Sequence, residues 1–160
     1  MMNSVENRYR QQAGFNLIEL MIVIAIIALL IGVGVPAWQS MVQSGNETTA
    51  VQSLSTIRTL QAQYAAKNQG NFAPTFDRLI QAVRLDEKFK GESPVVNGYI
   101  FRLTVQEATS ARPAFYSINA DPQVSTGIQA TGTRFFYFDS SLGTIKQKEG
   151  EPAKPTDSSV

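Results

Sequence analysis

The longest predominantly apolar stretch of the chain runs from Phe15 to Val35 and contains one charged residue, Glu19. As a helix, these 21 residues would rise about 32 Å, close to the thickness of the hydrocarbon core of a bilayer. A carboxylate inside such a span costs about 2.5 kcal/mol or more to insert. The pattern therefore predicts a membrane-crossing helix over residues 15–36 and marks Glu19 as a functional residue.

From residue 37 the hydrophobic positions recur at three- and four-residue steps, with Gln, Ser and Thr between them, which is typical of an amphipathic helix. These positions are Trp38, Met41, Val42, Val51, Leu54, Ile57, Leu60 and Tyr64. Gly45-Asn46 predicts a weak point, and the Asn-Gln-Gly-Asn sequence at 68–71 predicts the end of the helix. We expect the long helix to continue over residues 37–70, with this hydrophobic stripe packed against a globular domain.

The globular domain is expected over residues 71–148. Phe76, Leu79, Ile80 and Val83 have helical spacing, and Thr75 is placed to cap that helix. Asp86 to Gly91 reads as a charged turn, and the strand-like segments that follow are 99–105, 114–120, 134–139 and 144–147. The aromatic run at 135–138 indicates a central strand buried on both faces. The predicted fold class is α+β, with the long N-terminal helix packed on a small antiparallel sheet, and a mobile tail is expected at 149–160.

Composition argues against most enzyme classes. The chain has no cysteine and no histidine, so thiolate and imidazole metal sites, Cys-His pairs and a Ser-His-Asp triad are excluded. A Gly-rich phosphate loop and paired carboxylates at helical spacing are also missing from the sequence. The sequence therefore predicts no catalytic residue, no metal site and no cofactor, and we expect that the protein is not an enzyme.

Charge argues against an obligate nucleic-acid partner. Of 14 Lys and Arg and 13 Asp and Glu, the first 14 residues hold Arg8, Arg10 and Glu6, which leaves 12 of each sign for the rest of the chain. A balanced chain offers no basic stripe that would follow a phosphate backbone.

Two ordinary interpretations of the N-terminal segment remain open from the residues alone. It reads as a secretory signal with a weak cut near Val35-Pro36-Ala37, although the apolar run is long for that purpose. It also reads as a plain membrane anchor, held with its N-terminus inside by Arg8 and Arg10, in which Glu19 extends toward the lipid headgroups.

A third interpretation accounts for more of the residues. The sequence Ala13-Gly14-Phe15-Asn16-Leu17-Ile18-Glu19-Leu20 closely resembles the cleavage motif of type IV prepilins and pseudopilins. The resemblance implies that a prepilin peptidase in the membrane removes residues 1–14 as a leader by cutting between Gly14 and Phe15. Phe15 would then be N-methylated. Asn16 departs mildly from the family, where threonine is commonest.

In that family the glutamate corresponding to Glu19 pairs with the new amino terminus of a neighbouring subunit. Opposite charges attract strongly where the dielectric is low, so such a pair favours assembly. An internal pair between Phe15 and Glu19, four residues apart, is a geometric alternative.

Gly32, Gly34 and Pro36 weaken the helix where the apolar run ends. The simple interpretation is a kinked membrane exit. The resemblance implies instead a segment that unwinds in assembled pili.

The resemblance implies a structural subunit that is held in the inner membrane as a precursor. Pilus assembly machinery would then polymerise it into an extracellular homo-oligomeric filament, with adhesion, twitching motility or DNA uptake as possible roles. The alternative is a pseudopilin of a type II secretion system, which forms a periplasmic pseudopilus, and a membrane-anchored binding domain is the third possibility. A pseudopilin-like calcium site would have to use Asp121, Asp139 and Glu149, whose spacing is more typical of solvated turn acids.

Overall fold

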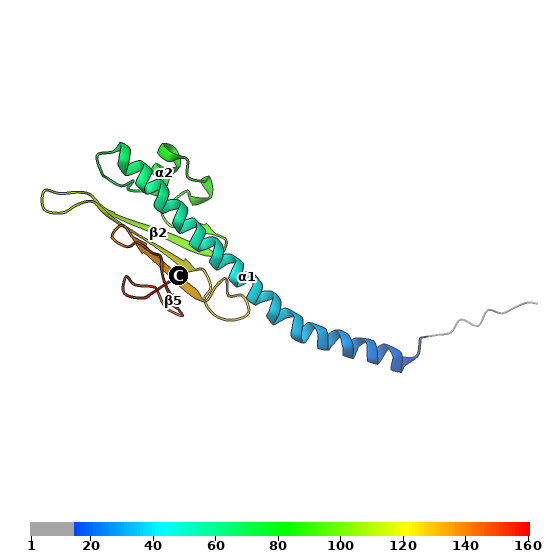
Figure 1. The fold of residues 1–160 in the computed structure, drawn as a ribbon. Coiled ribbons are helices and arrows are strands. Elements are labelled where there is room, and N and C mark those ends of the chain that lie inside the picture. Colours follow the sequence, from blue (N-terminus) through cyan, green and yellow to red (C-terminus); the bar gives the residue numbers. More distant parts are fainter. Residues whose placement is uncertain (1–14) are drawn as a thin grey trace, which may run out of the picture. The chain divides into compact units, whose positions relative to one another are not determined.

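The computed structural model describes residues 15–160 (Figure 1). The predicted leader 1–14, including Gly14, lies outside the described residues. The chain divides into two units, one reaching to Ala37 and one from Trp38 to Val160. Both contain part of helix α1 (Leu17–Lys67).

Helix α1 ends close to the predicted stop. Lys67 is its last residue, and Gln69 and Gly70 follow in left-handed conformation at φ 56° and 83°. The Gly70 amide donates to the carbonyl of Ala65 at 2.9 Å, which closes the helix end. Helix α1 runs without a break through the predicted weak point at Gly45-Asn46.

The second helix follows the predicted pattern. Helix α2 (Phe76–Val83) is capped by Thr75, whose hydroxyl accepts from the Arg78 amide at 3.3 Å. It ends at Arg84, which adopts a left-handed conformation. The predicted charged turn contains one turn of 3₁₀ helix, η1 (Glu87–Phe89).

The remainder of the chain forms one antiparallel sheet with strands in sequence order. Its members are β1 (Val95–Val96), β2 (Tyr99–Gln106), β3 (Phe115–Pro122), β4 (Arg134–Asp139), β5 (Lys146–Glu149) and β6 (Ser158–Ser159). Three predicted strands match β2, β3 and β4 to within two residues, and the fourth begins two residues later than expected. The α+β class with a small antiparallel sheet is confirmed.

The core lies between the second half of α1 and the sheet (Figure 1). Leu54 and Ile57 of α1 are fully buried together with Tyr99, Phe101 and Ile118 of the sheet. The aromatic run in β4 is buried on both faces as predicted, because the adjacent residues Phe135 and Phe136 are both buried. This core fixes α1 from about residue 47 onward.

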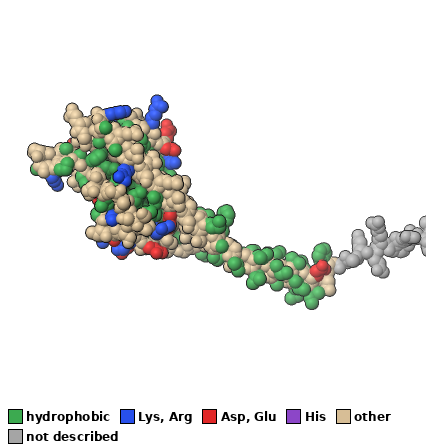
Figure 2. All heavy atoms as spheres, viewed as in Figure 1, with side chains coloured by type: hydrophobic (Ala, Val, Ile, Leu, Met, Phe, Trp, Pro, Cys, Tyr) green, Lys and Arg blue, Asp and Glu red, His purple; other side chains and the backbone are tan. Residues whose placement is uncertain are grey.

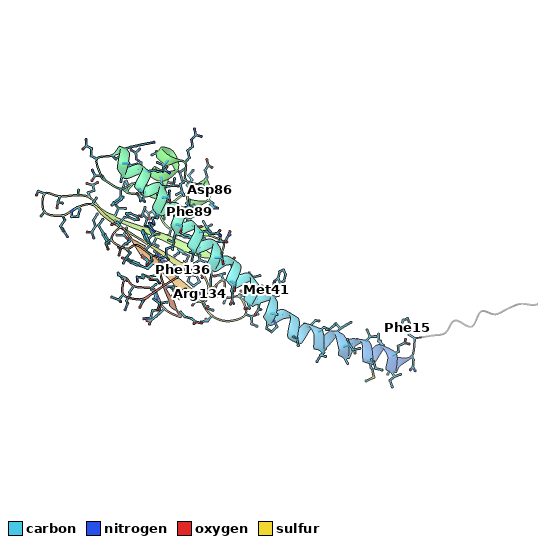
Figure 3. The ribbon with its side chains drawn as sticks, viewed as in Figure 1. Phe15, Met41, Asp86, Phe89, Arg134 and Phe136 are labelled. Atoms are coloured by element: carbon cyan, nitrogen blue, oxygen red, sulfur yellow. The ribbon has the colours of Figure 1, made fainter. Side chains whose placement is uncertain are left out.

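Two expectations differ from the structure. The tail at 149–160 was expected to be mobile, yet β6 pairs with β5 and the Val160 amide donates to the Ile145 carbonyl at 3.0 Å. The hydrophobic stripe of α1 was expected to be packed along its whole length. Its first members are exposed instead, since Trp38 retains 69% and Met41 72% of its accessible surface. Figure 3 labels Met41 on α1.

Candidate functional site

The first turn of α1 is stabilised by the residue that departs from the prepilin pattern. The Asn16 side-chain oxygen accepts from the Ile18 amide at 3.2 Å, and the Asn16 carbonyl accepts from the amides of Glu19 and Leu20. Asn16 is therefore the N-cap of α1, and asparagine is among the best residues for that position. The substitution of asparagine for threonine keeps a capping side chain there.

Glu19 occupies the third position of the helix, within the first turn. A carboxylate there is favoured by the exposed amide groups and the positive end of the helix dipole. Phe15 directly precedes the cap and is 86% exposed, and Figure 3 labels it at this end of the helix. Among residues 15–160 the structure records no hydrogen bond or salt bridge to the Glu19 carboxylate. The internal pair with Phe15 requires a free amino group on Phe15, so it stays a prediction for the cut chain.

The apolar part of α1 is exposed on every side. All residues from Phe15 to Pro36 are exposed, and the segment contains a window long and apolar enough to cross a membrane. Figure 2 shows hydrophobic side chains along the visible face of this segment. A helix that is hydrophobic all round requires an apolar surrounding, either lipid or other protein.

Gly32, Gly34 and Pro36 all lie within α1, and the helix is continuous through them. A Cβ atom added at either glycine would meet nothing within 4 Å. No packing in the described chain therefore requires glycine there. Pro36 lacks the amide that would bond the Gly32 carbonyl, so the helix is weakened at this turn without being broken. These three residues lie more than one turn from the Phe15–Glu19 end and form no common site with it.

Sequence reasoning missed a buried carboxylate, Glu47, which is 5% exposed. It accepts from the Thr133 amide at 2.9 Å, from the Arg134 amide at 3.2 Å and from Arg134 Nε at 2.7 Å. Arg134 Nη2 lies 2.6 Å from the second carboxylate oxygen. Figure 3 shows Arg134 at the start of β4 beside α1. This clamp joins α1 to the sheet.

The loop that holds the Glu47 partners is itself fixed by a close contact. The Tyr99 hydroxyl donates to the Arg134 carbonyl at 2.8 Å. A Cβ at Gly132 would overlap the Tyr99 hydroxyl, so only glycine fits beside the ring. Burial by itself raises the pKa of Glu47, but the amide of Thr133 and the guanidinium of Arg134 outweigh it and hold that pKa below its ordinary value.

A second polar contact fixes α1 near its other end. Gln61 is fully buried and forms two hydrogen bonds with the backbone of Ala73, donating at 3.0 Å and accepting at 2.8 Å. The sequence could have identified Gln61 and Glu47 as buried polar residues, because both lie on the hydrophobic face of the helix, where a polar side chain needs a hydrogen-bond partner.

Two of the three acids considered for calcium have other partners, and Glu149 is exposed at the end of β5. Asp139 accepts from the amides of Ser141 and Leu142 in the β4–β5 turn. Asp121 forms a 2.5 Å ion pair with Arg102. Within residues 15–160, no group of three such side chains is arranged to hold a metal ion.

Two comparisons with known proteins found a similarity. A family profile described as the prokaryotic N-terminal methylation motif matches residues 9–35. Prepilin peptidase-dependent protein D of Escherichia coli (strain K12) is 45% identical over 49 residues, which are 31% of this chain and 34% of that protein. The chain thus spans about a third of the length of this relative, and no solved structure matches it. The chain carries a prokaryotic N-terminal methylation motif at the start of a membrane-length helix.

Proposed function

We propose that this protein is a structural subunit of a type IV pilus. A prepilin peptidase cuts between Gly14 and Phe15, Phe15 is N-methylated, and the subunit polymerises through the apolar half of α1. The observation that supports this proposal is the coincidence of the methylation motif at 9–35 with an apolar helix exposed on every side. Lipid covers such a helix in the precursor, and neighbouring copies cover it in a filament.

Glu19 sets the axial offset between neighbouring subunits in the filament. Removal of the leader creates an ammonium group at Phe15, and Glu19 of another copy neutralises it. The unpaired carboxylate is costly in an apolar surrounding, so pairing favours the assembled state. Asn16 supports this role because it caps the first turn and so orders the helix end that presents both groups.

Gly32 and Gly34 serve the same assembly. Their surroundings are empty within the described chain, and small residues let helix backbones approach closely. Pro36 leaves the Gly32 carbonyl without its helical partner, so this turn unwinds at low cost when subunits pack.

The test begins with the mature protein. Its mass should correspond to a chain that begins at Phe15 with one added methyl group. Substitution of Gly14 by a bulky residue should abolish the cut. A mature chain beginning at any other residue would refute the proposal.

Assembly is tested separately with Glu19→Ala, which should be cut normally yet yield at least about tenfold fewer filaments, because the amino terminus of the neighbouring copy loses its partner. Glu92→Ala is the matched control, since Glu92 is an exposed loop residue of the globular domain. Normal filament yield from Glu19→Ala would remove the proposed role of this carboxylate.

The alternative is a pseudopilin of a type II secretion system, which uses the same signal and the same kind of helix. Purified surface filaments should contain this chain as a main component if it is a pilin. Recovery only within a secretion complex of the cell envelope would favour the pseudopilin. If the chain is a pilin, adhesion, twitching motility and DNA uptake are each compared between cells that produce it and cells from which it is deleted.

A further inference from the structure

The exposed start of the amphipathic stripe has no partner within the globular domain. Trp38, Met41 and Val42 are all exposed, whereas Leu54, Ile57 and Tyr64 farther along the same stripe are buried. Trp38 is the only tryptophan of the chain. A large aromatic residue and a methionine one turn apart are therefore left uncovered just beyond the apolar segment.

The sequence around these residues does not fix the outer end of the membrane span by charge. No charged residue occurs between Glu19 and Glu47, and Glu47 is buried in its clamp with Arg134. The residues that follow Trp38 are uncharged and polar, mainly Gln, Ser, Gly and Asn. Lys and Arg commonly anchor the ends of a span, and the sequence has neither between Arg10 and Arg58.

We propose that Trp38, supported by Met41, anchors the helix in the headgroup region of the outer face of the membrane before assembly. Indole is enriched at this depth because its ring is apolar and its N–H finds polar partners. Trp38 follows the last residue of the apolar run, Val35, by three positions, or about 4.5 Å of helix. This places it where the hydrocarbon core gives way to headgroups.

The anchor sets the depth of the residues at the other end of the span. Glu19 precedes Trp38 by 19 residues, a helix rise of about 28 Å. If Trp38 lies in the headgroups on one side, Glu19 and Phe15 reach the opposite edge of the hydrocarbon layer of the bilayer, which is about 30 Å thick. The proposal rests on the membrane stage of the proposed function, and it adds that Trp38 holds the cleavage point at the inner surface.

The composition of the chain allows a direct test with the full-length protein in phosphatidylcholine and phosphatidylglycerol vesicles. Because Trp38 is the sole tryptophan, its fluorescence reports its own depth. Lipids brominated near the headgroup should quench it most strongly, lipids brominated near the chain end less, and aqueous acrylamide weakly. The matched control, Trp38→Phe with Ser44→Trp, moves the indole six residues outward and should reverse the order, with acrylamide the strongest quencher.

A second measurement tests anchoring itself. The chain has no cysteine, so Ser40→Cys gives a single thiol for labelling with a membrane-impermeant maleimide. Adding Trp38→Ser should raise its labelling rate several-fold, because the outer end of the span is then free to rise into water. Adding Trp38→Tyr, which retains an interfacial ring, should leave the rate within twofold of the parent.

The outcomes separate this proposal from the proposed function. The anchor is overturned by any of three results: strongest quenching by lipids brominated near the chain end, strongest quenching by acrylamide, or equal labelling rates in all three cysteine variants. None of these results contradicts the proposal that the subunit is held in the membrane. Failure of the protein to float with vesicles overturns both. If only assembled filaments shield Trp38 from acrylamide, its partner is a second copy of the chain and the anchor is refuted.

Discussion

Two glutamates of helix α1 are in opposite situations. Glu47 is buried and holds five polar contacts with Thr133 and Arg134. Glu19 is exposed at the start of the helix, in a segment with no polar neighbours apart from Asn16. The first carboxylate stabilises one folded chain, and the second is available to a partner. Their substitution should therefore affect different stages of the life of the protein.

Replacing Glu47 by alanine should destabilise the globular domain by about 3 kcal/mol, since the amides of Thr133 and Arg134 and the guanidinium of Arg134 lose their acceptor. The free energy of unfolding is measured by denaturant titration of the full chain in detergent, with tyrosine and tryptophan signals as probes. Glu92→Ala should change it by less than about 0.5 kcal/mol. If Glu47→Ala lowers the free energy of unfolding no more than Glu92→Ala does, the clamp contributes nothing to stability.

The clamp should also be sensitive to acid. The folded-state pKa of Glu47 is lowered, so its contribution is fully present above the unfolded value near pH 4.3 and is lost as pH falls through the lower folded pKa. The stability difference between the parent and Glu47→Gln should thus be constant from pH 7 to about 5 and shrink below pH 4. Measuring both proteins at each pH removes the effect of other carboxylates. A difference that grows toward low pH would contradict the lowered pKa.

Helices and strands were predicted correctly where the residues that define them lie close together in the sequence. Helix α2 was predicted with its cap because Thr75 and the helical spacing lie within nine residues. Strand β4 was predicted to its exact bounds by an unbroken aromatic run. β1 and β6 have two residues each, which is too few for an alternating pattern. In addition, the Pro- and Lys-rich composition of the tail is typical of an irregular segment, so β6 was not predicted.

The candidate site divides in the same way. Gly14, Phe15 and Glu19 belong to one contiguous motif, which sequence alone identifies. The Glu47 clamp joins residues that are 87 positions apart, so their meeting depends on the register of the whole sheet. The exposure of Trp38 was missed for a related reason. Helical spacing defines a face but not where the partner domain ends along it.

The α1 helix should become more rigid in Pro36→Ala. The new amide restores the bond to the Gly32 carbonyl, and alanine is favoured over proline in a helix by about 3 kcal/mol. Amide hydrogen exchange between residues 32 and 40 should slow accordingly in micelles. Filaments made from this variant should extend less under load.

Gly34→Ala serves as the comparison for Pro36→Ala. It should also slow amide exchange, but by an amount that corresponds to only about 1 kcal/mol of helix stability, because glycine is less favourable than alanine in a helix by about that much. Unchanged exchange in Pro36→Ala, with a response in Gly34→Ala, would show that the proline does not weaken this turn.

For the whole molecule, the division into two units separates the methylation motif from the folded core. The methylation motif and the membrane-length segment lie within the unit that ends at Ala37, while the core, the Glu47 clamp and the sheet lie in the unit from Trp38 to Val160. A change confined to the second unit should therefore lower the stability of the subunit without altering the cut. The C-terminus offers the smallest such change.

Deleting residues 158–160 should remove β6 and leave β5 as an exposed sheet edge. The loss includes the bond from the Val160 amide to the Ile145 carbonyl and the β5–β6 pairing, so about 1–3 kcal/mol of unfolding free energy should be lost. Mass analysis should still find a chain that begins at Phe15, and filament yield should fall as temperature rises. Ser158→Ala keeps the backbone pairing and should behave as the parent does. An uncut precursor in the truncated variant would show that processing depends on the folded domain, and that the two units do not act independently.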